Sequence, residues 1–143
     1  MNRPTWDEVY MQIAQIIASR GTCPRAQVGA VLVDPGNRII STGYNGAPKG
    51  MPHCTDVGCI ILPNGSCGRS VHAEINAMMQ AGPGTREATL YTTTSPCYPC
   101  AASIVNIGIV KVVFEWRYRN IPGIPDPVDF LIQCGVEVVH LPR

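Results

Sequence analysis

Residues 88–116 read ATLYTTTSPCYPCAASIVNIGIVKVVFEW, which predicts a strand, a helix and a second strand in succession. The first strand is expected over 88–94 and the helix over 95–106, with Gly108 just after its end. The run 110–116 is almost entirely apolar, which is typical of a strand at the centre of a sheet that is covered on both faces. Such a unit predicts a right-handed crossover between strands of one sheet.

The rest of the chain continues this alternation in both directions. Further helices are expected at about 5–20, 71–81 and 126–134, and further strands at 27–34, 38–43 and 136–140. The turn Asp34-Pro35-Gly36-Asn37 joins the first two strands as an antiparallel hairpin. This order predicts an α/β fold, a three-layer α/β/α sandwich with a central mixed sheet of about five strands, in one domain over 1–143.

Composition and charge exclude several classes of protein. A length of 143 residues suits one domain, and an apolar share of 45% argues against disorder. The chain has 11 Lys and Arg and 10 Asp and Glu. The resulting net charge of +1 creates no electrostatic field that would attract a polyanion. No apolar run is long enough for a membrane span, and the N-terminus lacks the core of a signal peptide. We therefore expect a cytoplasmic protein with no nucleic-acid or membrane partner.

Two short motifs stand where the second and third helices begin: HAE at 72–74 and PCYPC at 96–100. The chain has seven cysteines and no secretion signal, so metal binding or catalysis is expected before disulfides. The two cysteines of the second motif are three residues apart, on a first helical turn whose dipole favours thiolates. Together with His72 they offer two sulfurs and one nitrogen to zinc and leave a fourth position for water.

Glu74 follows this histidine by two residues and is expected to act as the general acid and base. It can take a proton from water without occupying the metal. The pattern H-x-E…P-C-x-x-C is the signature of zinc-dependent nucleobase deaminases. Taken separately, Cys97 and Cys100 fit a redox pair and His72 fits an ordinary folded histidine. For both motifs together the alternative is a structural zinc site.

With these motifs the chain resembles the cytidine deaminase-like superfamily and, more closely, the deoxycytidylate (dCMP) deaminases. Four stretches resemble family motifs: VGAV at 28–31, GYNG at 43–46, HAEINA at 72–77 and TSPCYPC at 94–100. The resemblance covers nearly the whole chain. It implies zinc-dependent hydrolysis of dCMP to dUMP and ammonia, a reaction that supplies dUMP for dTMP synthesis.

The resemblance also implies which residues bind the substrate. Asn45 would contact the sugar, Ala73, Ser95 and Pro96 would frame the base, and Tyr118 would close over the ring. The 5′-phosphate needs cationic or backbone donors. Its candidate cationic ligands are Arg25, Arg117 and Arg119, which the sequence does not rank.

Five cysteines lie outside the PCYPC motif. Cys134 is expected as a small buried residue on the apolar face of the last helix. The other four, Cys23, Cys54, Cys59 and Cys67, fall in loops, three of them in a long insert at about 44–70. Four thiolates can close a structural zinc site and fasten such a loop. The irregular spacing leaves open that His53 replaces one sulfur, and the resemblance to dCMP deaminases, many of which carry a second zinc there, favours this site.

The family resemblance implies further properties for the loop of Gly43, Tyr44, Asn45 and Gly46. It would form part of an effector site where dCTP with Mg²⁺ activates and dTTP inhibits, in a homohexamer. From the residues alone, the same stretch is an ordinary turn, because Asn-Gly favours positive φ. Two other functions stay open: a DNA-uptake-operon protein of the same fold, and a deaminase of nucleosides or nucleic acids. The net charge of +1 argues against a nucleic-acid substrate.

Overall fold

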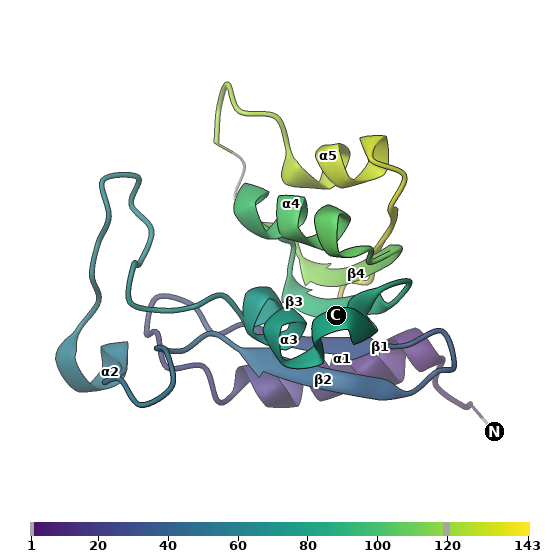
Figure 1. The fold of residues 1–143 in the computed structure, drawn as a ribbon, viewed down its shortest axis with the longest axis horizontal. Coiled ribbons are helices and arrows are strands. Elements are labelled where there is room, and N and C mark those ends of the chain that lie inside the picture. The colour runs from purple at the N-terminus through teal and green to yellow at the C-terminus, as the bar shows by residue number, and fades with distance from the viewer. Residues whose placement is uncertain (1, 119–120) are drawn as a thin grey trace.

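The computed structural model describes residues 2–118 and 121–143, and its centre is a five-stranded sheet with helices on both faces (Figure 1). The helices are α1 (Trp6–Ala18), α2 (Cys54–Val57), α3 (Ala73–Ala81), the 3-10 helix η1 (Gly82–Thr85), α4 (Tyr98–Ile107) and α5 (Pro127–Gln133). The strands are β1 (Gly29–Val33), β2 (Ile39–Tyr44), β3 (Thr89–Thr94), β4 (Lys111–Trp116) and β5 (Glu137–His140). The predicted α/β/α class is confirmed.

The sheet has the strand order β2-β1-β3-β4-β5 and is mixed. Strand β1 runs antiparallel to both of its neighbours, whereas β3, β4 and β5 are parallel to one another. The predicted hairpin of β1 and β2 is therefore present. The position of β1 between β2 and β3 was not predicted, because local patterns indicate which strands exist and not which strand edges pair.

Two separate apolar clusters hold the layers together. Tyr10, Met11 and Ala14 of α1 pack on one face of the sheet, against Val31, Val33, Tyr91 and Val113. Helices α3, α4 and α5 pack on the other face, where the strand residues are Ala30, Leu32, Leu90 and Val112. Alternate residues of β1 point to opposite faces, so this strand is buried along its whole length. Burying each Val or Leu of such a strand contributes about 1.5–3 kcal/mol before the entropy of ordering is subtracted.

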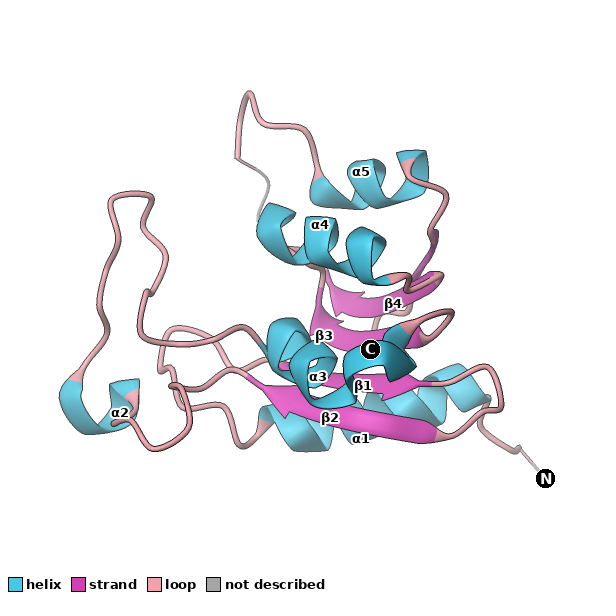
Figure 2. Cartoon of the chain, viewed as in Figure 1, coloured by secondary structure: helices cyan, strands magenta, loops and turns pink. Residues whose placement is uncertain are grey.

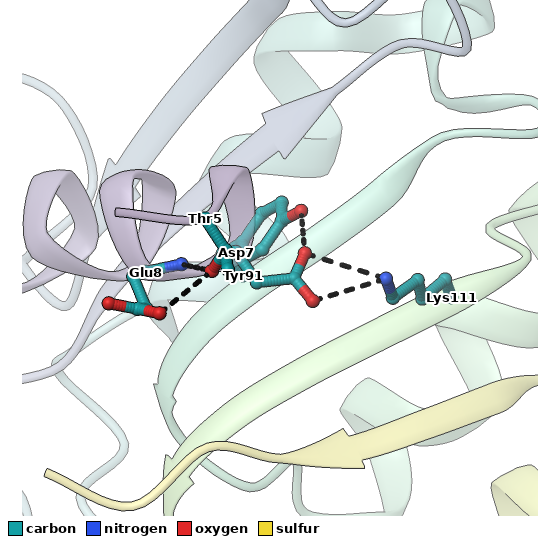
Figure 3. A network of polar contacts seen from close by, with 5 residues as sticks. All are labelled: Thr5, Asp7, Glu8, Tyr91 and Lys111. Carbon is teal, nitrogen blue, oxygen red and sulfur yellow. Dashed lines mark hydrogen bonds and ion pairs between the residues drawn. The ribbon is translucent and has the colours of Figure 1, made fainter. Parts of the chain in front are cut away.

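A polar network fastens α1 to β3 and β4 (Figure 3). The Tyr91 hydroxyl donates to Oδ1 of Asp7 at 2.6 Å, and Nζ of Lys111 lies 3.3 Å from Oδ2 of the same carboxylate. Burial, and then the neighbouring Asp7, raise the pKa of the Tyr91 hydroxyl above its usual range, so this hydroxyl keeps its proton and donates. Thr5 caps the start of the same helix by accepting from the Glu8 backbone at 3.2 Å.

The insert at 44–70 is mostly loop and projects away from the sheet (Figure 2). Its two ends meet in an isolated antiparallel bridge between Gly46 and Val71. A second bridge, between Ile61 and Cys67, pairs the two sides of its tip. The insert also contains α2, a single helical turn that is too short for the sequence to show periodicity. We call the first of these two bridges, between Gly46 and Val71, the neck of the insert.

One expectation about the C-terminal region was wrong. Cys134 is exposed and is not part of the apolar face of α5. The helix ends at Gln133, and Cys134 follows as its C-cap, just before Gly135 turns the chain with a φ of 85°. Within residues 2–118 and 121–143, no helix has the length and apolar character needed to cross a membrane.

Candidate active site

The candidate site lies where α3 and α4 begin. His72 is the N-cap of α3 and Cys97 is the N-cap of α4, and neither side chain is used to cap its own helix. Cys100 lies one turn into α4 and is buried. The Nδ1 atom of His72 is 3.2 Å from Sγ of Cys100 and 3.4 Å from Sγ of Cys97. The three residues predicted as ligands therefore converge.

The geometry of these three donor atoms fits one tetrahedral ion. All three lie within 4.8 Å of one another. From usual zinc–ligand distances, a nitrogen and a sulfur on one tetrahedral zinc are separated by about 3.6 Å. The observed separations of 3.2 and 3.4 Å are close to this value. His72, Cys97 and Cys100 can therefore hold a zinc ion and leave one position for a further ligand.

The electrostatics of the cluster favour a thiolate at Cys97. Hydrogen bonding from the Cys100 thiol, together with His72 and the Cys100 backbone, lowers the pKa of Cys97 to about 4. The same hydrogen bond, with burial and the nearby Glu74, raises the pKa of Cys100. The hydrogen bond between His72 and Cys97 raises the pKa of the His72 imidazole. Cys97 thus offers a thiolate, the form in which a cysteine binds a metal ion.

Glu74 is the buried carboxyl group beside this cluster. It is the second residue of α3 and its side chain is 5% exposed. Burial raises the pKa of this carboxyl to about 7, and its own backbone amide and His72 offset part of that shift. A group with this pKa accepts and donates a proton with similar ease at neutral pH. Its oxygens do not belong to the group of donor atoms formed by His72, Cys97 and Cys100, and its role as general acid and base stays a prediction.

Four more cysteines, three of them in the insert and one before β1, gather in a second cluster. The Sγ atoms of Cys23 and Cys59 are 3.7 Å apart and those of Cys54 and Cys67 are 3.5 Å apart. All four sulfurs lie within 4.8 Å of one another, and two sulfurs on one tetrahedral zinc are separated by about 3.8 Å. Although burial alone would raise it, backbone amides of Arg69, Ser70 and Ile60 lower the pKa of Cys67 to about 6. The predicted set of four can therefore close around one ion.

His53 does not belong to this group of four sulfurs. Its Nδ1 atom accepts from the Thr22 hydroxyl at 2.9 Å and from the Ala47 backbone at 3.2 Å. Its backbone amide donates to Asp56 at 3.0 Å, which completes a capping box at the start of α2. Neither the contact with Thr22 nor that with Asp56 was predicted, because no spacing pattern indicates them.

The residues expected to frame the base lie next to the candidate ligands along the chain. Ala73, Ser95 and Pro96 are buried beside the ligands. The Ser95 backbone donates to the Trp116 carbonyl at 2.7 Å, and its hydroxyl accepts from the Tyr118 backbone at 2.5 Å. These bonds join the end of β3 to the end of β4 and bring Tyr118, which is 48% exposed, to the same end of the sheet.

Asn45 has a structural role that was not predicted. Its Oδ1 atom accepts from the Val28 backbone at 2.7 Å, and its Nδ2 atom donates to the Ala26 carbonyl at 2.6 Å. Both ends of the amide therefore brace the segment that leads into β1. A contact of Asn45 with the sugar stays a prediction.

Gly43 is explained by packing. A Cβ atom at this position would lie 2.3 Å from the Ala73 carbonyl oxygen and 2.6 Å from the Ala77 nitrogen. Glycine thus lets β2 approach the backbone of α3, which carries Glu74. An effector role for residues 43–46 stays a prediction.

Of the three arginines named as candidates for the phosphate, the structure describes two. Arg25 is exposed in the loop that follows Cys23. Arg117 forms an ion pair with Asp126 at the start of α5. Arg119 lies outside the described residues.

A glutamate two residues after a histidine ligand, facing a Cys-x-x-Cys turn, is the arrangement of zinc-dependent hydrolases that deaminate nucleobases. Comparison with known proteins agrees with this class. The family model for the cytidine and deoxycytidylate deaminase zinc-binding region matches residues 4–116, so the chain belongs to this family.

Individual relatives point to the same family. Deoxycytidylate deaminase of Schizosaccharomyces pombe is 41% identical over 126 residues, which cover 82% of this chain and 39% of the yeast protein. ComE operon protein 2 of Bacillus subtilis is 39% identical over 141 residues, covering 96% of this chain and 72% of that protein. The crystal structure of dCMP deaminase from cyanophage S-TIM5 in complex with dCMP and dUMP is similar with a TM-score of 0.80 and 32% identity, covering 99% and 100% of the two chains. The chain thus spans less than half of the yeast relative and all of the phage one.

Proposed function

We propose that this protein is a zinc-dependent dCMP deaminase, which converts dCMP and water to dUMP and ammonia. The observation that carries the proposal is the buried carboxyl of Glu74, with a pKa raised to about 7, next to a converging set of one imidazole and two thiols. Similarity to proteins named deoxycytidylate deaminase supports dCMP as the substrate.

His72, Cys97 and Cys100 would hold the catalytic zinc, and Cys23, Cys54, Cys59 and Cys67 a structural one. Zinc bound by His72, Cys97 and Cys100 acts as a Lewis acid and lowers the pKa of a water ligand to about 7. Four sulfur ligands would fill all four tetrahedral positions of a zinc ion and leave none open for a substrate, which is typical of structural zinc. Magnesium is proposed only as the partner of a triphosphate effector.

Glu74 would move the protons of the reaction. Its carboxylate accepts one proton from the attacking water and delivers it to N3 of the cytosine ring, while the water oxygen bonds to C4. The same carboxyl then carries the second proton to the amino group, which leaves as ammonia when the C4–N4 bond breaks. Burial raises the pKa of this carboxyl, which favours a group that can both take up and release a proton. Its burial keeps bulk water from competing for the proton.

The surrounding residues would bind the nucleotide. Ala73, Ser95 and Pro96 form a buried wall for the base, and Tyr118 supplies an aromatic side chain at the open side. Asn45 and Arg25 are proposed contacts for the sugar and the phosphate. The family resemblance supports both contacts. Arg25 is also exposed, in the loop that follows Cys23, where a phosphate could reach it.

Regulation and assembly are proposed from the family resemblance. The loop of Gly43, Tyr44, Asn45 and Gly46 would take part in binding dCTP with Mg²⁺ or dTTP, and the chain would form a homohexamer. Exposed apolar side chains such as Met79 and Ile61 are available for contacts between subunits. A cytoplasmic location is supported by the seven free cysteines, which a reducing compartment preserves.

The assay that tests this function compares dCMP, dCTP, deoxycytidine and a single-stranded oligonucleotide as substrates of the zinc-loaded protein. We expect ammonia release from dCMP, with sigmoidal kinetics that dCTP makes hyperbolic. Preference for the oligonucleotide would support the nucleic-acid alternative. Absence of turnover with all four would contradict the proposed deamination and favour the alternative of a DNA-uptake-operon protein of the same fold, to which the similarity to ComE operon protein 2 points. Indifference to both triphosphates would contradict the regulation alone.

A further inference from the structure

Two side-chain contacts join the start of α5 to segments at the active site. Arg117 forms an ion pair with Oδ2 of Asp126, and the Tyr98 hydroxyl donates to the Pro125 carbonyl. The other carboxylate oxygen of Asp126 accepts from the Val128 backbone at 2.9 Å and so caps α5. One carboxylate therefore ends the loop, starts the helix and holds the arginine.

The guanidinium of Arg117 has a second partner. Its Cζ atom lies 5.6 Å from the centre of the Phe114 ring, within the range of a cation–π contact. The same ring stacks on His140 with a centroid distance of 4.7 Å and an interplanar angle of 11°. Phe114 is 1% exposed, so the arginine lies on a fixed surface. Its charge is partly neutralised by Asp126, which weakens it as a ligand for a phosphate.

The residues next to these contacts belong to the active site. Tyr98 directly follows the ligand Cys97, and Tyr118 directly follows Arg117. The backbone of Tyr118 is in turn bonded to the Ser95 hydroxyl at 2.5 Å. The start of α5 is thus connected to the site through Tyr98, which is next to Cys97, and through Arg117, which is next to Tyr118.

We infer that Arg117 is a positioning residue for substrate binding and does not bind the phosphate. Its ion pair with Asp126 fixes residues 116–118 against Ser95 and thereby sets where Tyr118 stands beside the base. Without the pair, the backbone of Tyr118 loses its fixed position, so nucleotide binding weakens while proton transfer by Glu74 continues. The inference rests on the proposed deamination of a cytosine nucleotide.

The test uses Arg117→Gln, Asp126→Asn and the double variant, with dCMP and deoxycytidine as substrates. Asparagine at 126 can still accept from Val128, so α5 keeps its cap. We expect each single variant to raise KM for both substrates by about three- to tenfold, with kcat within about twofold, because a partly exposed pair has a modest energy. The double variant should be no worse than the more impaired single one.

The matched control is Lys111→Gln, which breaks the ion pair with Asp7 at the opposite end of the same strand. It should leave KM unchanged. If Arg117 instead binds the 5′-phosphate, another result is expected. Arg117→Gln would then impair turnover of dCMP and not of deoxycytidine, and Asp126→Asn would have no effect. That result, unchanged KM in both single variants, or effects that multiply in the double variant would overturn the inference.

A readout without turnover separates this inference from the proposed function. Hydrogen exchange of the Tyr118 amide, which donates to Ser95, should be faster in Arg117→Gln and Asp126→Asn than in the wild type and in Lys111→Gln. Unchanged exchange would overturn the positioning role even if no substrate is deaminated. Faster exchange in a protein without deaminase activity would count against the proposed function only.

Discussion

His72 and Cys97 are 25 residues apart in the chain, yet Nδ1 of the first lies 3.4 Å from Sγ of the second. Each is the N-cap of a helix, and these helices, α3 and α4, pack on the same face of the sheet. Because the helix starts meet at one end of the sheet, the two side chains reach a common point without a long loop between them.

The first prediction concerns metal content. The wild-type protein should bind two zinc ions per chain, and Cys97→Ser and Cys67→Ser should each bind one, because each removes a donor from a different cluster. Cys134→Ser is the control and should bind two, since Cys134 is exposed and belongs to neither cluster. Elemental analysis of the dialysed proteins measures this. A content of one zinc per chain in the wild type would contradict the proposed structural zinc site.

The second prediction concerns Glu74. The substitution Glu74→Gln should keep zinc, since Glu74 is not among the ligating atoms, and should lose about 10²–10⁴-fold in kcat as the proton carrier is removed. Glu137→Gln, at an exposed position on β5, is the control and should turn over normally. Steady-state kinetics with zinc analysis of the same samples decides the matter. Turnover of Glu74→Gln near that of the wild type would refute the proton-carrying role.

The third prediction concerns pH. The pKa of the Glu74 carboxyl is raised from its ordinary 4.5 to about 7 in the folded protein, mainly by burial. Between these values the native state holds a proton that the unfolded state has lost, so stability falls as pH rises through this window. Glutamine at 74 cannot ionise and escapes this loss. Metal-free Glu74→Gln should therefore be more stable than the metal-free wild type at pH 8, by on the order of 3 kcal/mol.

Urea unfolding of both metal-free proteins at pH 5, 6.5 and 8 measures this difference. The stability gap should grow with pH up to about 7 and stay constant above it. A gap that is the same at all three values would mean that burial of the ionised carboxylate is not its cause.

The fourth prediction concerns Gly43. Alanine there would place its Cβ atom 2.3 Å from the Ala73 carbonyl oxygen, so backbone must move, at a cost of about 2–3 kcal/mol. Gly84→Ala is the matched control, because its nearest neighbour would be Cδ1 of Ile40 at 3.7 Å, an ordinary contact. Its stability should change by no more than about 0.5 kcal/mol. Equal unfolding midpoints for the two variants would contradict the packing role of Gly43.

The sequence predicted the four longer helices, α1, α3, α4 and α5, and the five strands well, because these depend on local patterns. The candidate zinc ligands could be named from the sequence for a similar reason. His72, Cys97 and Cys100 carry the chemistry that zinc requires, and each stands at a helix start that its neighbours reveal. The strand order could not be predicted, since the pairing of β1 with β3 depends on edges that are far apart in the chain. The exposure of Cys134 was missed because one residue decides whether it lies in α5 or beyond it.

The contacts of polar side chains were the least predictable part of the site. Asn45 braces the backbone of Ala26 and Val28, and Asp126 divides its carboxylate between Arg117 and Val128. Such partners are chosen by three-dimensional proximity and leave no periodic signal. The four cysteines around the insert were identifiable by chemistry, and their pairing in space needed the fold.

The neck at Gly46 and Val71 separates the tip of the insert from the rest of the chain. Cys67, one of the four clustered cysteines, pairs with Ile61, and the exposed turn between them at Asn64 and Gly65 has φ of 86° at the glycine. A short peptide inserted at this exposed turn would extend into solvent, and its two ends would join the chain at adjacent residues. The tip therefore offers a place to attach a fluorophore or an affinity tag to the protein without disturbing its catalytic centre.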